Sequence, residues 1–101
     1  MTEYQVGIDE QALSDIDAIS DQRTVEAIYR RIADLKTEPQ VQGKALTGDL
    51  KGYRSVRAGG QRYRIVYEVI EAASAVDVVV VGIRKDGHRT DAYAIAEKRL
   101  T

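Results

Sequence analysis

The chain has 101 residues with a formal net charge of −1, and 44% of its residues are hydrophobic and 31% charged. This length and balance predict one globular domain over residues 1–101 and exclude pervasive disorder. The chain has no cysteine, which excludes disulfides and sulfur-ligated zinc. It also has no apolar run near the roughly 18 to 20 residues of a membrane span. We therefore expect a cytoplasmic protein with no metal, cofactor or membrane partner.

The small net charge hides a division between the two parts of the chain. Residues 1–40 hold 4 basic and 9 acidic groups, a net of −5, whereas residues 41–101 hold 11 basic and 7 acidic groups, a net of +4. Any polyanionic partner is therefore expected to bind the second part.

The first 40 residues are predicted to form a strand and a helical hairpin. Apolar and polar residues alternate over 4–8, which indicates a strand. Asp9 can cap a helix that runs to residue 19, and Ser20 or Asp21 can cap a second helix that must end before Pro39. The apolar positions that recur at helical spacing are Ala12, Leu13, Ile16, Ile19, Val25, Ile28, Ile32 and Leu35.

The rest of the chain is predicted to contain three strands and a short helix. Segment 43–52 is too glycine-rich for a helix and too irregular for a strand, so we expect an ordered connection there. Strands are predicted over 53–58, 62–70 and 75–83, with a Gly59-Gly60 turn between the first two. The four valines at 78–81 predict a central strand that is covered on both faces.

A terminal helix is predicted over residues 91–100, with Asp91 as its cap. The residues expected to face inward are Ala92, Ile95, Ala96 and Leu100. The element order indicates an α+β fold, with an N-terminal strand, a helical hairpin packed on an antiparallel sheet and a short C-terminal helix. We expect the helices on one face of the sheet and the other face open to solvent or a ligand.

Alternation in the second predicted strand separates charged from apolar side chains. Arg62, Arg64 and Glu68 share the outer face, and the inner face carries Tyr63, Ile65, Tyr67 and Val69. A tight turn at Gly59-Gly60 is expected to place Arg57 opposite Arg62, and Ser55 opposite Arg64. The three arginines at 57, 62 and 64 should therefore form one exposed patch.

This patch favours a polyanion site over an ordinary solvated surface. Between Gly43 and Arg64 there are six basic residues and one acidic residue, Asp49, whereas a solvated surface is normally mixed in sign. Gly82 is predicted to let a ligand backbone approach the last strand closely. The candidates for phosphate or RNA contact are Lys44, Lys51, Arg54, Arg62, Lys85, His88 and Arg89. His88 alone in a loop is more often a surface residue than a catalyst.

No catalytic triad, phosphate loop, metal-ligand spacing or carboxylate pair is present in the sequence. The residues instead resemble the RelE/ParE toxin superfamily of type II toxin-antitoxin systems. The resemblance rests on Pro39, Gly43-Lys44-Ala45-Leu46 with Gly48, Leu50 and Gly52, Tyr53-Arg54-Ser55-Val56-Arg57, Arg62-Tyr63-Arg64-Ile65-Val66-Tyr67, Gly82-Ile83-Arg84-Lys85 and Asp91-Ala92-Tyr93.

The resemblance implies two activities on one scaffold. RelE-like members are mRNA interferases, endoribonucleases that cut mRNA in the ribosomal A site and so inhibit translation, whereas ParE-like members poison DNA gyrase. The RelE-like reading is preferred because Arg64 and Arg84 match phosphate-contacting arginines and Tyr93 matches a C-terminal tyrosine. Arg54 matches a lysine, and either Val56 or Arg57 stands where RelE has another lysine.

In a RelE-like mechanism, the catalytic set would be Arg57, Arg64, Arg84 and Tyr93. Arg84 would serve as acid or phosphate ligand, although His88 is chemically better suited to donate a proton. The implied partners are a cognate antitoxin, the ribosome and mRNA, with no metal or other cofactor. The loop before Tyr93 is longer than in RelE and the chain is acidic overall, so a gyrase inhibitor and an inactive family member stay as alternatives.

Overall fold

The computed structural model describes residues 3–101. Its main elements are β1 (Gln5–Ile8), α1 (Glu10–Asp17), α2 (Gln22–Ala33), β2 (Lys44–Ala45), β3 (Tyr53–Ala58), β4 (Tyr63–Ile70), β5 (Ala75–Ile83) and α3 (Ala92–Leu100). The predicted α+β order is confirmed, but the connection at 43–52 contains the short strand β2, which the sequence did not predict. No helix within residues 3–101 has the length and apolar character needed to cross a bilayer.

The helices begin where the polar caps predict. The Asp9 carboxylate accepts a hydrogen bond from the backbone N–H of Gln11 and so satisfies one of the free donors of α1. Asp21 precedes α2, and Asp91 accepts from the backbone N–H of Tyr93 at the start of α3. The α2 helix ends at Ala33, before Pro39, as its sequence requires.

The described strands form one mixed sheet in the order β1-β5-β4-β3-β2. Strand β1 pairs with β5 in parallel, and the other pairs are antiparallel. The sheet is therefore antiparallel as predicted except at this edge, where one parallel pair makes it mixed. The apolar pattern of β1 identified a strand but carries no information on its partner or direction, which depend on how the helical hairpin returns the chain to the sheet.

The hairpin between β3 and β4 has a register two residues away from the predicted one. Ala58 pairs with Tyr63, so Arg57 faces Arg64 rather than Arg62. The turn is four residues long, and Gly59, Gly60 and Gln61 all have positive φ, which places Arg62 in the turn instead of the strand. Because side chains alternate with a period of two, a shift of two leaves the side chains that remain in the strands, such as Arg57 and Arg64, on their predicted face.

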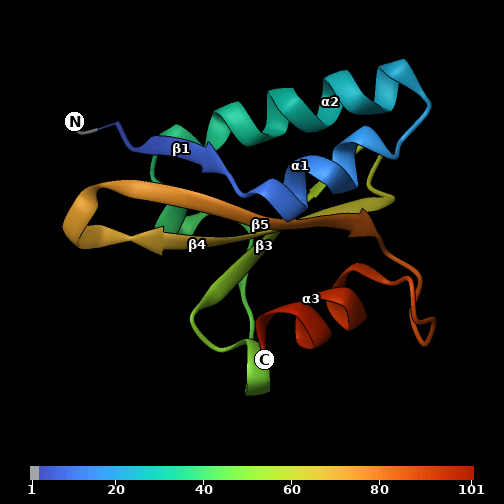
Figure 1. Ribbon diagram of the computed structural model, residues 1–101. Helices are drawn as coiled ribbons and strands as arrows, with labels where there is room; N and C mark the ends of the chain where they lie inside the picture. The colour runs from blue at the N-terminus through green and yellow to red at the C-terminus, as the bar shows by residue number, and fades with distance from the viewer. Residues whose placement is uncertain (1–2) are drawn as a thin grey trace.

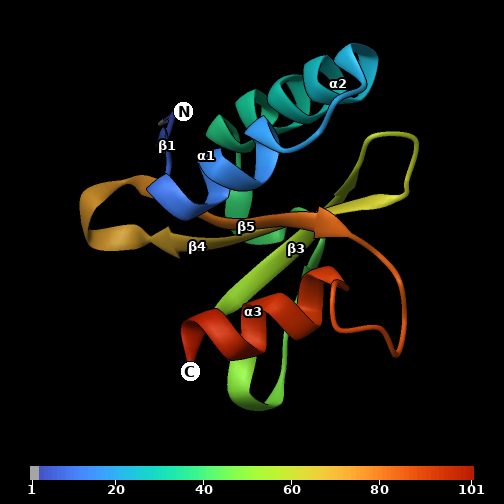
Figure 2. The ribbon, with the colours of Figure 1, turned by 45° about the vertical axis from the view of Figure 1, so that its right-hand side comes forward.

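Apolar side chains fill both faces of the sheet. Helices α1 and α2 cover one face and α3 lies on the other, as Figures 1 and 2 show. The α1–α2 face is packed with Ala12, Ile16, Ile28, Ile32, Leu35, Ile65, Tyr67, Val76 and Val78, among others. The α3 face is packed with Leu50, Val66, Val79, Val80 and Ala96.

The α3 helix corrects the expectation of an open second face. Ala92 and Ala96 are fully buried, and Ile95 and Leu100 are half-buried, so the predicted inward face of the helix is confirmed. The valines at 78–81 are all buried, which confirms a central strand covered on both faces. The sequence had indicated an inward-facing side of the terminal helix and a valine strand covered on both faces. In the structure, α3 provides the cover on the second face of that strand.

Two carboxylates lie opposite each other on the antiparallel strands β4 and β5. Glu68 pairs with Asp77, and like charges in this arrangement destabilise a sheet. Burial, followed by the negative charge of Asp9, raises the pKa of Asp77 above its ordinary value. The folded protein therefore holds the Asp77 proton more tightly than the unfolded chain does.

We expect Asp77→Asn to raise the free energy of unfolding at neutral pH by a few tenths of a kcal/mol, up to about 1 kcal/mol. For an acid with a raised folded pKa, the stabilising contribution of the protonated form is complete below the unfolded pKa and is lost as the pH rises through the folded pKa. The advantage of the amide should thus vanish in acid. Urea denaturation at several pH values measures the difference in free energy of unfolding between Asp77→Asn and the parent, and exposed Asp49→Asn is the control. Equal stability of Asp77→Asn and the parent at neutral pH would contradict the prediction.

Candidate functional site

A cavity of about 580 Å³ lies beside the β3–β4 hairpin and the first turn of α3. Its lining is formed by Arg31, Gly43, Lys44, Ser55, Val56, Arg57, Gln61, Arg64, Arg84 and Tyr93. Five of these side chains carry a positive charge and none carries a negative one. The cavity is thus suited to a ligand with several negative charges.

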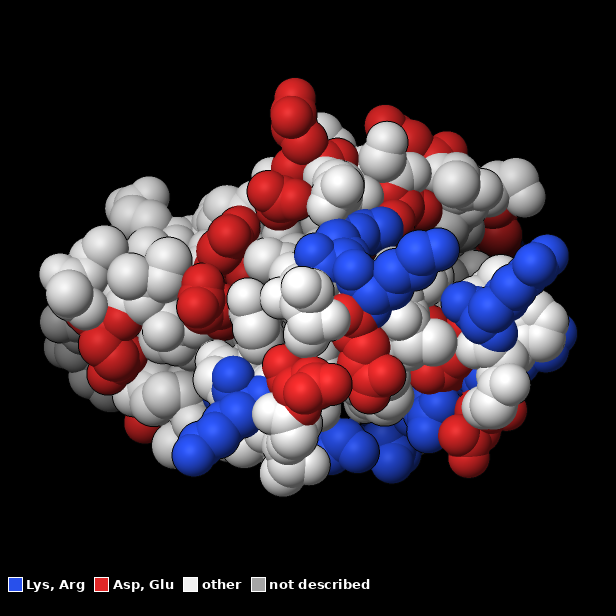
Figure 3. Space-filling view, turned by 60° about the horizontal axis from the view of Figure 1, so that its bottom comes forward, with Lys and Arg blue, Asp and Glu red and all other residues white. Residues whose placement is uncertain are grey.

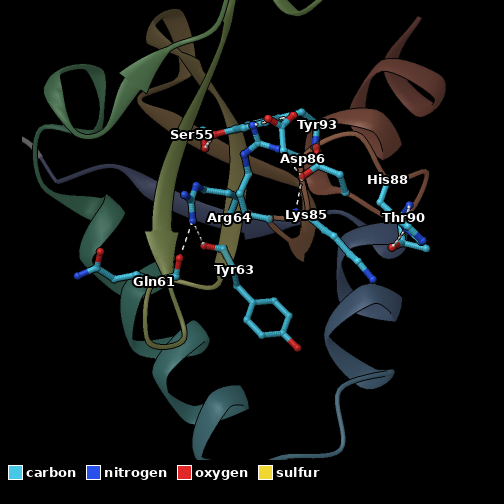
Figure 4. Close-up of polar contacts among 11 residues, drawn as sticks. Ser55, Gln61, Tyr63, Arg64, Lys85, Asp86, His88, Thr90 and Tyr93 are labelled. Carbon is cyan, nitrogen blue, oxygen red and sulfur yellow. Dashed lines mark hydrogen bonds and ion pairs between the residues drawn. The ribbon is translucent and has the colours of Figure 1, made fainter.

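Arg57 and Arg64 form the sheet side of the cavity because they are paired across β3 and β4. Nη1 of Arg64 donates to the backbone carbonyls of Gln61 at 2.8 Å and Tyr63 at 3.1 Å, a contact visible in Figure 4. Nη1 of Arg57 donates to Oε1 of Gln61 at 3.3 Å. Within residues 3–101 neither arginine forms an ion pair with a carboxylate, so both keep their full charge for a ligand.

Gln61 holds both arginines from an unusual backbone conformation. Its φ is 70°, in the left-handed region that residues with a Cβ seldom occupy. Such conformations are found preferentially at functional sites. Gln61 is a site residue that its sequence context did not indicate, beyond its place directly after Gly59-Gly60.

Arg84 lies at the end of β5, where a buried carboxylate fixes it. Its Nη1 donates to Oδ1 of Asp91 at 2.6 Å, and its Nη2 lies 3.5 Å from Oδ1 of Asp86. The hydrogen bond to Asp91 raises the pKa of Arg84 above its ordinary value. Since a higher pKa makes proton donation harder, a phosphate ligand is the better of the two roles that the resemblance gives Arg84.

Tyr93 projects from the first turn of α3 toward the sheet. Its hydroxyl forms a hydrogen bond of 2.9 Å with Oγ of Ser55 on β3 (Figure 4). Two cations lie over its ring, with Nζ of Lys44 at 5.4 Å and the guanidinium carbon of Arg84 at 4.9 Å from its centre. These cation–π contacts hold the ring and the two cations close together.

Arg54 is a predicted contact residue that the structure places outside the cavity. It pairs with Tyr67 and shares the α1–α2 face, where its Nε donates to the backbone carbonyl of Gln42 at 3.0 Å. The physical reason is the alternation of β3, which gives the cavity face to Ser55 and Arg57. The phosphate-contact prediction for Arg54 is therefore at odds with its position.

Of the other predicted contact residues, Lys44 lines the cavity and five lie outside its lining. These five are Lys51 in the turn before β3, Arg62 in the hairpin turn, and Lys85, His88 and Arg89 in the loop after β5. Nδ1 of His88 accepts from the backbone N–H of Thr90 at 3.2 Å and contacts its hydroxyl at 2.7 Å. Figure 4 shows this pair apart from Arg64 and Tyr93, so His88 is poorly placed to act as a proton donor there.

Gly82 allows α3, and not a ligand, to approach β5 closely. A Cβ built on Gly82 would lie 3.1 Å from Cα of Ala92 and 3.2 Å from its Cβ. The backbone of α3 therefore occupies the space that was assigned to a ligand. The glycine is needed because α3 must lie against the sheet to present Tyr93 to Ser55.

Arg31 and Ser55 are lining residues that the sequence analysis missed. Arg31 lies on α2, in the part of the chain with a net negative charge, and its Nη1 donates to Oε1 of Gln42 at 2.7 Å. Arg31 was therefore not expected in a cationic site, because the positive charge was assigned to residues 41–101. Ser55 shares the face of Arg57 on β3, where strand alternation had placed it, but it was not named as a site residue.

The lining of the cavity holds five of the chain's 15 lysine and arginine side chains and no acidic one. Figure 3 shows basic and acidic side chains interspersed on the face that carries α3 in the view from below. Among residues 3–101 no cluster of three or more His, Asp or Glu side chains is arranged to bind a metal ion. The arrangement can therefore bind an anion through several guanidinium groups at once.

A helical hairpin packed on a sheet that carries this cationic cavity is the architecture of a small toxin of a type II toxin-antitoxin system. The model of the family described as "ParE toxin of type II toxin-antitoxin system, parDE" matches residues 6–88. The chain belongs to this family, within the RelE/ParE superfamily that the sequence resembled. A search of curated protein sequences found no match.

Several solved structures are similar to this fold. The RelBE2 toxin-antitoxin complex from Mycobacterium tuberculosis contains a chain 29% identical, with 81% of this chain and 99% of that chain covered and a TM-score of 0.73. A mutant of the E. coli toxin RelE in the free state is 23% identical over the whole of both chains, with a TM-score of 0.74. The YoeB/ParE toxin from Agrobacterium tumefaciens is 24% identical, covers 80% of this chain and 99% of that chain, and has a TM-score of 0.67.

Proposed function

We propose that this toxin cleaves messenger RNA on the ribosome and that a cognate antitoxin restrains it. The observation that carries the proposal is the cavity of about 580 Å³, which has five cationic side chains and no acidic one in its lining. A phosphate flanked by several guanidinium groups is the ligand that this charge pattern favours. No metal or other cofactor is part of the proposal.

Cleavage would proceed by attack of an RNA 2′-hydroxyl oxygen on the adjacent phosphorus, which forms a 2′,3′-cyclic phosphate and breaks the bond to the 5′ oxygen of the next nucleotide. The 2′-hydroxyl loses a proton and the departing 5′ oxygen gains one. Negative charge develops on the phosphoryl oxygens in the transition state, and fixed donors stabilise this state more than the ground state. Arg57 and Arg64 are suited to this role because their contacts to Gln61 hold them without neutralising them. Arg84 would contact the same phosphate from the end of β5.

Proton transfer would depend on neutral hydroxyls and on the ribosome. Tyr93 and Ser55 are joined at 2.9 Å, and a hydroxyl can both donate and accept a proton. No histidine or carboxylate lines the cavity within the described residues. The ribosome would hold the RNA near attack geometry, a contribution worth several kcal/mol, so free RNA should be a poor substrate.

Inhibition of DNA gyrase is the second candidate function, and one observation favours it. The family model that matches residues 6–88 is that of ParE toxins, and the resemblance implies that ParE-like members poison gyrase without a nuclease site. In that case the cationic cavity would contact an anionic surface of its target, and Arg57 and Arg64 would contribute to binding alone.

The antitoxin partner is inferred from the kind of assembly seen in similar proteins. The M. tuberculosis RelBE2 and E. coli RelBE structures are toxin-antitoxin complexes. A partner for this chain is expected to place acidic or apolar segments over the cavity, because charge complementarity favours that orientation.

The deciding experiment compares three reactions of the purified protein. We expect cleavage of ribosome-bound message, little cleavage of the same message free in solution, and unchanged supercoiling by gyrase. Blocked supercoiling with intact ribosome-bound message would replace the proposal with gyrase inhibition. If neither target is affected, while induction of the chain also leaves growth unchanged, the protein is an inactive family member.

A further inference from the structure

One buried carboxylate joins the loop after β5 to the start of α3. Asp91 is only 4% exposed, and all three of its donors come from this region. Its Oδ1 accepts from Nη1 of Arg84 and from the backbone N–H of Lys85, both at 2.6 Å. Its Oδ2 accepts from the backbone N–H of Tyr93 at 3.0 Å.

These bonds connect two residues that line the cavity. Arg84 is held by its guanidinium and Tyr93 by its backbone, and neither Asp91 oxygen lines the cavity itself. The Arg84 guanidinium then lies 4.9 Å from the centre of the Tyr93 ring. A single carboxylate thus sets the position of a cation and an aromatic ring relative to each other.

We propose that Asp91 is a positioning residue, which fixes Arg84 in the orientation needed to contact the phosphate of the ligand. The proposal rests on the function proposed above, in which Arg84 binds that phosphate. Asp91 acts through Arg84, so its contribution should depend on the presence of that side chain.

The charge of Asp91 is maintained although the side chain is buried. Burial raises its pKa, but the hydrogen bonds from Arg84 and from the backbone of Lys85 and Tyr93 outweigh this effect, so the pKa lies below its ordinary value. The carboxylate is therefore ionised at neutral pH. Asp86 also approaches Arg84, but its side chain is 93% exposed and its distance is 3.5 Å, so an incoming phosphate can replace it more easily.

Asp91→Asn separates positioning from helix capping. Asparagine caps helices about as well as aspartate, so the bond to the Tyr93 N–H can be kept while the charged acceptor for Arg84 is lost. Asp91→Ser offers a second capping residue without the charge, in case the amide disturbs folding. Asp9→Asn is the matched control, because Asp9 caps α1 and has no arginine among its hydrogen-bond donors in the described residues.

The first measurement is single-turnover cleavage of ribosome-bound message by variants with melting temperatures near that of the parent. We expect Asp91→Asn to slow the saturated rate at least tenfold and Asp9→Asn to leave it unchanged. In an Arg84→Ala background, Asp91→Asn should cause no further loss, because the two changes remove one interaction. A parental rate, or the same fold loss in both backgrounds, would overturn the proposal.

The second measurement does not depend on cleavage. Nitrogen-15 NMR of the arginine side chains reports whether the Arg84 guanidinium is held, since a fixed group gives separate signals for its two terminal nitrogens. We expect separate signals in the parent and in Asp9→Asn, and merged signals in Asp91→Asn. Merged signals in the parent would overturn the positioning role, whereas separate signals in a parent that cleaves no message would leave positioning supported and overturn the proposed function.

Discussion

Replacing Arg64 with alanine is expected to lower cleavage of ribosome-bound message about a hundredfold. Removing one donor that stabilises developing charge typically costs about 3 kcal/mol of transition-state stabilisation. Arg64 is suited to such a role because its guanidinium is held by the carbonyls of Gln61 and Tyr63 and has no carboxylate partner among the described residues. The rate of the chemical step, measured with the ribosome complex in excess, tests this directly.

Glu68→Ala is the matched control for this experiment. Glu68 lies on β4 with Arg64 but is paired with Tyr53 and Asp77, away from the lining of the cavity. Both positions are partly exposed, so both variants should fold, and Glu68→Ala should melt at or slightly above the parent because it removes the like charge opposite Asp77. Equal cleavage by the two variants would remove Arg64 from the reaction and leave the cavity as a binding surface.

Gly82→Val is expected to destabilise the fold and to abolish activity together. The first Cβ atom alone would lie 3.1 Å from the backbone of Ala92, which cannot move aside as a flexible side chain does. Overpacking of this kind typically costs about 1 to 3 kcal/mol. The strain would push α3 away from β5 and carry Tyr93 away from Ser55, so loss of cleavage should exceed the loss expected from stability alone.

Gly7→Val provides the control, since Gly7 is also a strand glycine. A Cβ at that position would meet only the backbone oxygen of Val76, at 3.9 Å, and should be accommodated. Urea denaturation and the cleavage assay are run on both variants at the same temperature. The proposed docking of α3 is contradicted if Gly82→Val unfolds at the same urea concentration as Gly7→Val.

Local patterns predicted the helices and the longer strands of this fold and the face on which Arg57 and Arg64 lie. Arg57 and Arg64 could be assigned to the side away from the α1–α2 hairpin because alternation depends only on neighbouring residues. The assignment is correct although the predicted register was wrong by two residues. A shift by an even number changes which residues pair across the strands, but each side chain stays on the same face of the sheet. The same rule applied to β3 would have excluded Arg54 from the cavity.

Features that depend on distant parts of the chain could not be predicted in the same way. The direction of β1 is set by where the helical hairpin returns, and the cover on the second sheet face comes from α3. Arg31 reaches the cavity from a helix in the acidic part of the chain. The residues next to β1 and Arg31 in the sequence do not indicate which distant segment each of them contacts.

The parallel pairing of β1 with β5 joins two distant parts of the chain. Gln5 pairs with Ala75 and Ile8 with Val78, so this edge of the sheet closes only when segments from far apart in the chain have met. Contacts of such separation slow folding. Arg84 and Tyr93 follow β5 in the chain, so the lining of the cavity also depends on the last part of the chain. A chain shortened before Tyr93 would therefore lack one side of the cavity.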